Sequence, residues 1–349
     1  MRGALALALL ALPGCKLFAK PGRILVREGT SSATTRVLAE HVDGKGEDVI
    51  DVGAHDALPY PNGAGVLAVD ASNTGFLRHE KGRTGVVTCT TTSMVNLFAI
   101  DDAGDHVLFR TSAGKTETVH FMDLRSCAET KLEVRYAFRG DVARDGSEAA
   151  IGALPTTCAA PSMNDCPVTL FRLRPAGSPV PTEVLRAGPR AHYQPRYFPD
   201  GRLVFQTTEL DASCDGTING CRHDLVSLPI SGGPGSPLVT IRKGAIAASV
   251  SLDGKKIAYL AYTGADTTCH ARLPCYGMTL KVGDAHASDD AKDTAVAVGT
   301  VSNVPGRAFS LDGKWIAFAT GHDSEPELCR TDGTHCKSFA GKRLLGWVR

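Results

Sequence analysis

An Asp-Gly pair followed by a wholly apolar strand is the feature of this sequence that most restricts its fold. Residues 309–320 read FSLDGKWIAFAT, in which Asp312 and Gly313 separate two short β-type runs. Asp-Gly between such runs predicts a tight hairpin, because glycine adopts φ > 0 without a Cβ clash. The run 315–319 is apolar at every position, which is typical of a strand that is buried on both faces. The sheet that contains it must therefore be covered on both sides.

The same pattern returns along the chain. A turn glycine precedes an apolar strand at seven positions: Gly22, Gly63, Gly104, Gly146, Gly201, Gly254 and Gly313. The intervals between these glycines are 41, 41, 42, 55, 53 and 59 residues. Short strands broken by turn residues indicate an all-β chain, and a repeat of about 40–50 residues indicates the blades of a β-propeller. Stacking the blades face to face in a ring would bury both faces of each strand.

The number of copies and the two chain ends predict how the ring is built. Seven copies favour seven blades, and six is the alternative if Gly22 is a false copy. Residues 342–349 form a last strand with no turn after it, and residues 22–27 supply the strand that would follow. We therefore predict a single propeller domain over residues 15–349, closed by the N- and C-terminal strands within one blade.

Three copies carry a resemblance to a known family. The stretches 197–207, 249–262 and 309–320 contain SLDG- or FPDG-type turns followed by strands such as KKIAYLAY. They resemble the repeats of TolB-type and WD-repeat-like β-propellers, and those of the propeller domains of prolyl-oligopeptidase-like enzymes. The resemblance implies a propeller architecture, usually of six blades in the TolB type, and a setting in the bacterial envelope. It implies no particular partner.

The first residues predict export. Arg2, the apolar run 4–12 and the small residues after it form a secretory signal over residues 1–14. The segment LPGC at 12–15 resembles the bacterial lipoprotein signal box, so we expect Cys15 to be the lipidated first residue of the mature chain. The alternative is an ordinary secretory signal with an incidental cysteine. Lys16 favours the outer membrane by analogy with enteric bacteria, which predicts an outer-membrane lipoprotein, periplasmic or surface-facing, held to the membrane by its lipid anchor.

The cysteines predict disulfides rather than a metal site. Ten of the 11 cysteines remain without Cys15, and disulfides persist in exported proteins. Eight form close pairs in the sequence: Cys158 with Cys166, Cys214 with Cys221, Cys269 with Cys275, and Cys329 with Cys336. The last pair flanks Asp332-Gly333 symmetrically, so a hairpin turn would place the two residues opposite each other. Cys89 and Cys127 then pair by elimination. No CxxC motif supports zinc.

Long loops predict where binding would occur. The three longest intervals carry their insertions after the second strand, and each insertion contains a cysteine pair. Long ordered loops on a rigid scaffold often bind ligands; the alternative is that the disulfides only protect the loops from proteolysis. Within residues 211–219 the order of oxygen-bearing side chains follows that of a calcium-binding loop, which predicts a structural Ca²⁺ and no other cofactor. The candidate ligands are Asp211, Ser213, Asp215 and Asn219. The closing Glu is missing, so a chance match is the alternative.

The central channel is the other expected site. His192, Tyr193 and Arg196 lie in or near an innermost strand, where they would meet an acidic or sugar-like ligand; the alternative is that they are wall residues with local partners. The motifs GxSxG and HExxH are absent, which makes an enzyme less favoured without excluding one. The net charge is +1 without a basic stripe, which argues against a nucleic-acid partner.

These observations predict a non-catalytic binding module of the envelope, with a protein or a glycan as partner. A propeller enzyme, such as a polysaccharide lyase or hydrolase with a channel site, is the rival, and a purely structural envelope lipoprotein is the third alternative. A channel that holds His, Arg and acidic groups with shifted pKa values would favour the enzyme. An apolar patch on the looped face would favour the binding module.

Overall fold

The computed structural model describes most of the chain. It describes residues 22–29, 35–43, 46–80, 83–114, 116–158, 168–175, 182–185, 190–209, 223–229, 236–266, 275–299, 301–320, 325–339 and 341–349. The predicted signal peptide and Cys15 lie outside these residues. The described residues contain 27 strands and no helix, which confirms the all-β prediction.

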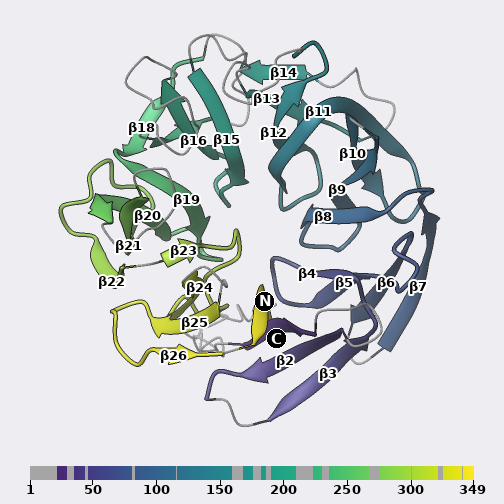
Figure 1. The fold of residues 1–349 in the computed structure, drawn as a ribbon, viewed down its shortest axis with the longest axis horizontal. Coiled ribbons are helices and arrows are strands. Elements are labelled where there is room, and N and C mark those ends of the chain that lie inside the picture. Colours follow the sequence, from purple (N-terminus) through teal and green to yellow (C-terminus); the bar gives the residue numbers. More distant parts are fainter. Residues whose placement is uncertain are drawn as a thin grey trace, which may run out of the picture.

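The strands form sheets arranged around a common axis as a β-propeller (Figure 1). The sheet at the chain ends has the order β27-β1-β2-β3, with β27 (Lys342–Val348), β1 (Arg23–Glu28), β2 (Arg36–His41) and β3 (Glu47–Val52). The next sheet contains β4 (Asp56–Pro59), β5 (Gly65–Val69), β6 (Gly75–Glu80) and β7 (Arg83–Thr90). A seven-stranded sheet follows, with β8 (Val95–Ile100), β9 (His106–Ala113), β10 (Thr116–Asp123), β11 (Glu129–Val142), β12 (Ala149–Pro155), β13 (Thr169–Leu173) and β14 (Thr182–Leu185).

Three four-stranded sheets complete the ring. One contains β15 (Arg190–Tyr197), β16 (Leu203–Glu209), β17 (Asp224–Leu228) and β18 (Val239–Arg242). Another contains β19 (Ala245–Val250), β20 (Lys256–Asp266), β21 (Cys275–Asp284) and β22 (Thr294–Gly299). The last contains β23 (Val301–Asn303), β24 (Trp315–Thr320), β25 (Glu325–Arg330) and β26 (Lys337–Ser338).

The described strands therefore form six sheets, which is the alternative number and not the favoured seven. The reason is the strand β11, which is 14 residues long. Its residues 129–134 pair with β10, and its residues 134–142 pair with β12. One long strand thus joins two groups of strands into a single seven-stranded sheet.

The turn glycines have the predicted backbone conformation at every copy of the repeat. All seven turn glycines have positive φ, between 65° and 84°: Gly22, Gly63, Gly104, Gly146, Gly201, Gly254 and Gly313. In the turn before β24, Ser310 Oγ donates to Asp312 Oδ1 at 2.6 Å and accepts the Trp315 N–H at 2.9 Å. Ser251 and Asp253 make the same pair of contacts before β20. Side-chain bonds to the turn backbone explain why serine and aspartate occupy these positions.

The ring closes between the two ends of the chain, as predicted. β1 pairs antiparallel with β27, so that Leu25 lies opposite Gly346. The side chains of β1 alternate between two neighbours: Ile24 and Val26 pack in one cluster with Ala317 and Leu328 of the last sheet, and Leu25 packs with Ala57 and Val66 of the second. Burial on both sides explains why strands of this kind are apolar at every position.

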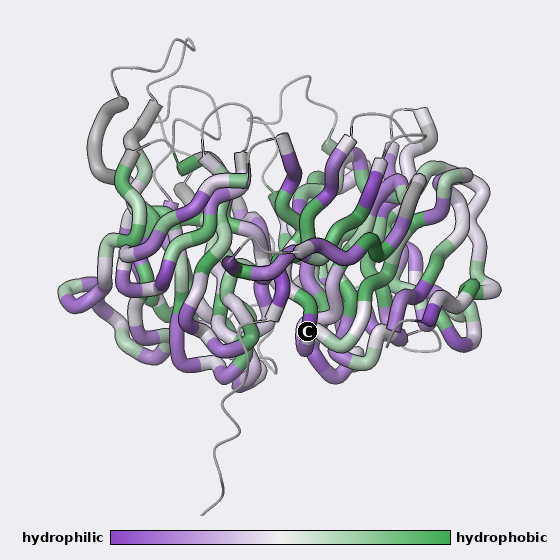
Figure 2. The backbone as a smooth tube through the Cα atoms, turned by 90° about the horizontal axis from the view of Figure 1, so that it is seen from below, coloured by the Kyte–Doolittle hydropathy of each residue, from purple (hydrophilic) through white to green (hydrophobic). Residues whose placement is uncertain are grey.

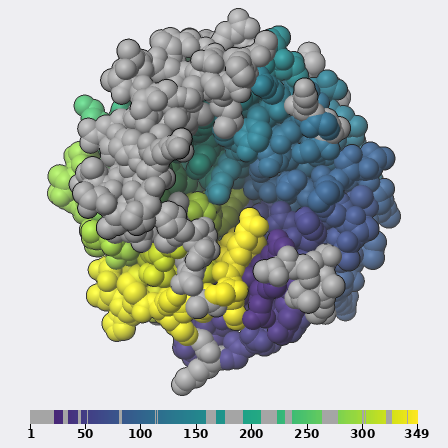
Figure 3. Space-filling view, viewed as in Figure 1, coloured from purple at the N-terminus to yellow at the C-terminus, as the bar shows by residue number. Residues whose placement is uncertain are grey.

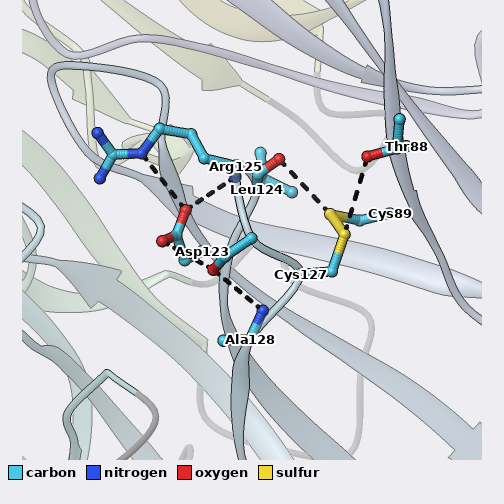
Figure 4. The surroundings of a disulfide bond; sticks show 8 residues. Thr88, Cys89, Asp123, Leu124, Arg125, Cys127 and Ala128 are labelled. Atoms are coloured by element: carbon cyan, nitrogen blue, oxygen red, sulfur yellow. Dashed lines mark hydrogen bonds and ion pairs between the residues drawn. A yellow bond between two sulfur atoms is a disulfide. The ribbon is translucent and has the colours of Figure 1, made fainter.

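Two of the predicted disulfides are confirmed. Cys329 and Cys336 join β25 to the segment before β26, with their Cα atoms 4.1 Å apart. Cys89 of β7 bonds to Cys127 in the turn between β10 and β11, with a Cα distance of 5.3 Å (Figure 4). This second bond links two neighbouring sheets near their outer strands. Cys158 is also disulfide-bonded.

The side view shows a flat ring (Figure 2). Hydrophobic residues are common within the strands, and hydrophilic residues are common in the connections at their ends. A search of the described residues finds no helix long and apolar enough to cross a membrane.

Candidate functional site

A cavity of about 820 Å³ lies where the innermost strands of the sheets face one another. Most of its wall comes from β27, β4, β8, β11 and β15 and from the segment after β23, and β1, β9, β23 and β24 contribute one residue each. Each inner strand from β4 onward leads into an Asp-Gly-type turn, so all these turns lie on one face of the ring, called here the turn face. The first residues of the inner strands lie toward the opposite face. In Figure 3 the C-terminal residues lie beside the N-terminal strands close to the centre of the ring.

The cavity wall is strongly basic although the chain is almost neutral. Seven basic side chains line it: Arg27, Arg110, Arg139, Arg196, Arg307, Lys342 and Arg343. Among the residues that the structure describes, only two carboxylates do so, those of Asp56 and Asp141. The net charge of the whole chain is +1, so the positive charge is concentrated in the channel. Walls of one sign focus the electrostatic field and attract ligands of the opposite sign.

Some of these cations already have acidic partners. Arg110 Nη1 lies 2.9 Å from Glu117 Oε1, and Lys342 pairs with Glu40. Arg307 Nη2 lies 3.7 Å from Asp141 Oδ1. Among the described residues the other four arginines, Arg27, Arg139, Arg196 and Arg343, make no ion pair with a carboxylate at contact distance. These four are the cations most available to a ligand.

Arg27 and Arg343 lie at the point where the ring closes. They are directly opposite each other in the register of β1 and β27. The Nε atom of Arg27 is buried without a hydrogen-bond partner among the described residues. Asp56 lies in the electrostatic field of both arginines. Burial raises the pKa of the Asp56 carboxyl, against the opposing effect of Arg343 and of two backbone N–H groups.

Asp56 also links two sheets. Its Oδ2 accepts the N–H of Leu97 in β8 at 3.2 Å, and its Oδ1 accepts the N–H of Ala57 at 3.0 Å. Asp141 makes the corresponding contact farther round the ring, where its Oδ2 accepts the N–H of Tyr197 at 2.9 Å. Both channel carboxylates are therefore engaged in holding neighbouring sheets together. Two carboxylates also cannot balance the charge of the seven basic side chains in the cavity wall.

Arg139, Arg196 and Arg307 form another part of the wall. Burial lowers the pKa of each guanidinium, and the charge of a neighbouring arginine lowers it further: Arg343 acts on Arg139, and Arg139 acts on Arg196. Arginine nevertheless stays protonated in proteins. Arg196 is 7% exposed, and its Nη1 donates to the carbonyl oxygens of Gly140 and Pro195 at 3.0 and 3.1 Å. Buried like charges favour the entry of an anion.

Aromatic rings lie beside the cations. The Arg110 guanidinium lies 5.6 Å from the ring centre of Phe98 and 5.4 Å from that of Tyr136. Tyr136 is 38% exposed and packs edge-on against Phe138, with ring centres 5.0 Å apart. All three aromatic residues line the cavity. The channel thus combines cations with an exposed aromatic surface.

The structure separates the three residues that the sequence placed in the channel. Arg196 lines the cavity. His192 is 3% exposed, and its Nδ1 lies 3.1 Å from Thr207 Oγ1. Tyr193 is equally buried and packs against Phe138, and burial raises the pKa of its phenol. Neither His192 nor Tyr193 is a lining residue, so a role for them in binding stays a prediction.

Sequence reasoning missed most of the channel arginines. Arg139, Arg196 and Arg307 stand seven, five and six residues before their turn glycines. That position corresponds to the end of the inner strand or the segment leading to the turn. An arginine five to seven residues before a turn glycine is therefore the sequence signal that could have identified these three residues. Arg27 and Arg343 become visible as a pair only through the register of the closing strands.

Other predicted sites lie outside the described residues. These are Cys15, the calcium candidates Asp211, Ser213, Asp215 and Asn219, and the cysteines Cys166, Cys214, Cys221 and Cys269. Cys275 begins β21, and Cys269, its predicted partner, lies outside the described residues. Within the described part of the chain, no group of three His, Cys, Asp or Glu side chains is placed to hold a metal ion.

Comparison of the sequence with protein-family models and with curated proteins gives no match. Solved structures do match the fold. An oligogalacturonate lyase in complex with manganese is 12% identical, with a TM-score of 0.61 over 88% of this chain and 85% of that chain. An oligogalacturonate lyase from Vibrio parahaemolyticus is 7% identical, with a TM-score of 0.59 over 89% of this chain and 91% of that chain. At such identities the likeness shows a β-propeller fold alone.

TolB proteins are among the matching structures, as the sequence resemblance predicted. TolB from Acinetobacter baumannii is 12% identical, with a TM-score of 0.46 over 76% of this chain. The match spans 62% of the length of that TolB chain. The propeller architecture that the resemblance implied is shown by the arrangement of the sheets themselves.

Proposed function

We propose that this protein is a binding module whose central channel takes an acidic glycan. The observation that carries the proposal is a set of four arginines in one cavity of about 820 Å³ that make no ion pair with any described residue: Arg27, Arg139, Arg196 and Arg343. Arginine binds carboxylates through two parallel N–H donors, which favours a ligand that carries planar acidic groups. The rings of Phe98, Tyr136 and Phe138 offer apolar surface to the faces of sugar rings. An acidic segment of a protein partner is the other ligand that this wall would attract.

Binding of defined anions tests this proposal. Short oligogalacturonates are the probe, and neutral maltooligosaccharides of equal length are the control ligand, both titrated by calorimetry. We expect binding of the acidic oligomer only, weakening as salt rises because exposed charges are screened. Arg343→Gln should weaken it about tenfold or more, as loss of one partner of a buried charge pair does. Arg125→Gln, whose side chain is 62% exposed and pairs with Asp105 outside the channel, is the matched control and should bind normally. Equal binding of acidic and neutral oligomers would refute the proposal.

A second candidate function is cleavage of the same kind of glycan. Asp56 favours it, because this buried carboxyl has a raised pKa and lies among the channel arginines. A raised pKa helps a carboxyl act as a general acid, and shifted values cluster at catalytic sites. The oligogalacturonate lyases among the similar structures are compatible with this idea. Prolonged incubation with polygalacturonate should give shortened chains with the natural protein and none with Asp56→Asn if the protein is an enzyme.

The cellular location belongs to the same proposal. We propose an exported envelope protein, anchored in the outer membrane by a lipid on Cys15. The signal-like residues 1–14 and the disulfides support export, because disulfides persist outside the cytoplasm. The pairs Cys158–Cys166, Cys214–Cys221 and Cys269–Cys275 and the calcium loop at 211–219 remain proposals. The intact mass of the membrane fraction, before and after reduction, would test the lipid and the disulfide number together.

The number of repeat units along the chain is a further part of the proposal. We infer seven repeat units, of which two share β11 within the seven-stranded sheet. Seven turn glycines with positive φ and the double pairing of β11 support this count.

A further inference from the structure

The turn face of the ring is nearly closed at its centre. A second cavity of only about 30 Å³ lies there. Residues that end or follow six different inner strands meet around it: Tyr60, Arg144, Pro199, Leu252, Leu311 and Trp347. This volume holds on the order of one water molecule. A cavity of this size has no room for a sugar unit.

Contacts between turns hold this closure in place. Arg144 donates from Nη1 to the carbonyl oxygen of Leu252 at 2.9 Å, although the two residues belong to different sheets. Its Nε also donates to Asp102 Oδ2 at 2.9 Å, and Asn62 donates to the Asp102 carbonyl at 2.8 Å. The N–H of Arg349 donates to Gly63 O at 2.9 Å. The closure is thus a bonded network and not a loose contact of side chains.

Arg307 separates the two cavities. It lines both the large cavity and the small one, and it lies 3.7 Å from Asp141. Beside it, Arg196 lies against the backbone at Gly306, where an added Cβ would be 2.7 Å from the Arg196 Nε. That Nε is buried and has no hydrogen-bond partner among the described residues. Arg196 and Arg307 therefore form the floor of the large cavity.

We propose that the channel is a blind pocket that binds an acidic glycan by one end, with the terminal acidic group on the floor formed by Arg196 and Arg307. This inference rests on the proposed function. The rest of the ligand must leave through the face opposite the turns, because the turns are bonded to one another and the cavity among them has no room for a sugar unit. The site then distinguishes chain ends from internal units. A polymer threaded through the ring would require a channel open at both faces, and a polymer lying across the ring would not enter the pocket. Neither arrangement would place an end group on Arg196 and Arg307.

The number of proteins bound per glycan chain tests the inference. Wild-type protein is titrated with a short oligogalacturonate and with polygalacturonate about ten times longer, by calorimetry and by sedimentation. End binding predicts the same number of proteins per chain at both lengths. Binding to internal units would raise the number about tenfold, as expected for a multivalent ligand. Arg307→Gln should weaken binding of both probes by at least about tenfold, as removal of a charged partner does.

The outcomes distinguish this inference from the proposed function. A constant number of proteins per chain supports the blind pocket. A number that rises with chain length overturns it and leaves acidic-glycan binding intact. Absence of binding to either probe refutes the proposed function, and the inference falls with it. The comparison of chain lengths uses the natural protein, so its result does not depend on whether Arg307→Gln folds.

Discussion

Arg27 and Arg343 face each other across the closing strands, where like charges normally destabilise a sheet. Two guanidinium groups in this position are unfavourable for the empty protein and favourable for one that holds an anion. We therefore expect Arg343→Gln to leave the ligand-free protein equally stable, or more stable by about 0.2–1 kcal/mol. Urea unfolding without ligand measures this, with Arg125→Gln as the surface control. A clear loss of stability would mean that Arg343 is a structural residue.

His120 predicts how stability depends on pH. Its Nε2 lies 2.9 Å from Thr111 Oγ1, and its Nδ1 lies 2.7 Å from Glu129 Oε2. Burial lowers its pKa below the usual 6.5 and outweighs the opposing effect of Glu129. Below pH 6.5 His120 is therefore protonated to a greater extent in the unfolded chain than in the folded chain. The free energy of unfolding falls as the pH falls, by at most about 1.4 kcal/mol per pH unit.

The pH effect of His120 can be separated from that of its partner. Burial acts to raise the pKa of Glu129, but Lys131 and His120 together lower it, so the stability that Glu129 contributes is lost only below its usual pKa of 4.5. His120→Gln should flatten the stability profile between these two values and leave the acidic limb in place. Unfolding midpoints measured at several pH values would show this. An unchanged slope between pH 4.5 and 6.5 would contradict the assignment.

At the scale of elements, the two described disulfides should differ in their contribution to stability. Cys89–Cys127 spans 38 residues and joins two sheets, whereas Cys329–Cys336 spans seven within one sheet. Loop-closure entropy predicts losses of about 4 and about 2.4 kcal/mol respectively when each bond is removed. Paired Cys→Ala variants, compared by urea unfolding, test the order. A larger loss for the hairpin bond would show that native packing, and not loop length, decides.

The repeat was predictable from the sequence because its signal is local. An Asp-Gly turn needs glycine at positive φ, and Ser310 and Asp312 bond to their own turn, so a few adjacent residues specify each hairpin. The joining of two groups of strands by β11 was not predictable, because it depends on which partners one continuous strand finds. The position of His192 and Tyr193 outside the cavity lining was hard to predict for a similar reason. A strand alternates its side chains between two faces, but the bulge between Tyr193 and Arg196 changes which side chains face inward.

For the whole molecule, the closing strand links the fold to the channel. β27 supplies Trp347, whose Nε1 donates to Ala308 O at 2.8 Å, and it also supplies Arg343 to the cavity wall. Without β27 the strand β1 would expose its inner edge, and the packing of the terminal sheet against both neighbours would lose one side. The ring is a closed structure in which each sheet depends on two others, so loss of one strand affects all of them.

Deleting residues 341–349 should therefore abolish cooperative thermal unfolding. Adding these residues back as a synthetic peptide should restore the transition, because the pairing with β1 needs backbone contact and not covalent continuity. A peptide that carries Arg343→Gln should restore folding equally well but should not restore the binding of oligogalacturonate. A peptide with Trp347→Ala should restore neither folding nor binding fully, because the loss of a buried tryptophan costs about 3–5 kcal/mol. Calorimetry with and without the acidic oligomer separates the two effects. A truncated protein that still unfolds cooperatively would show that the ring does not depend on its closing strand.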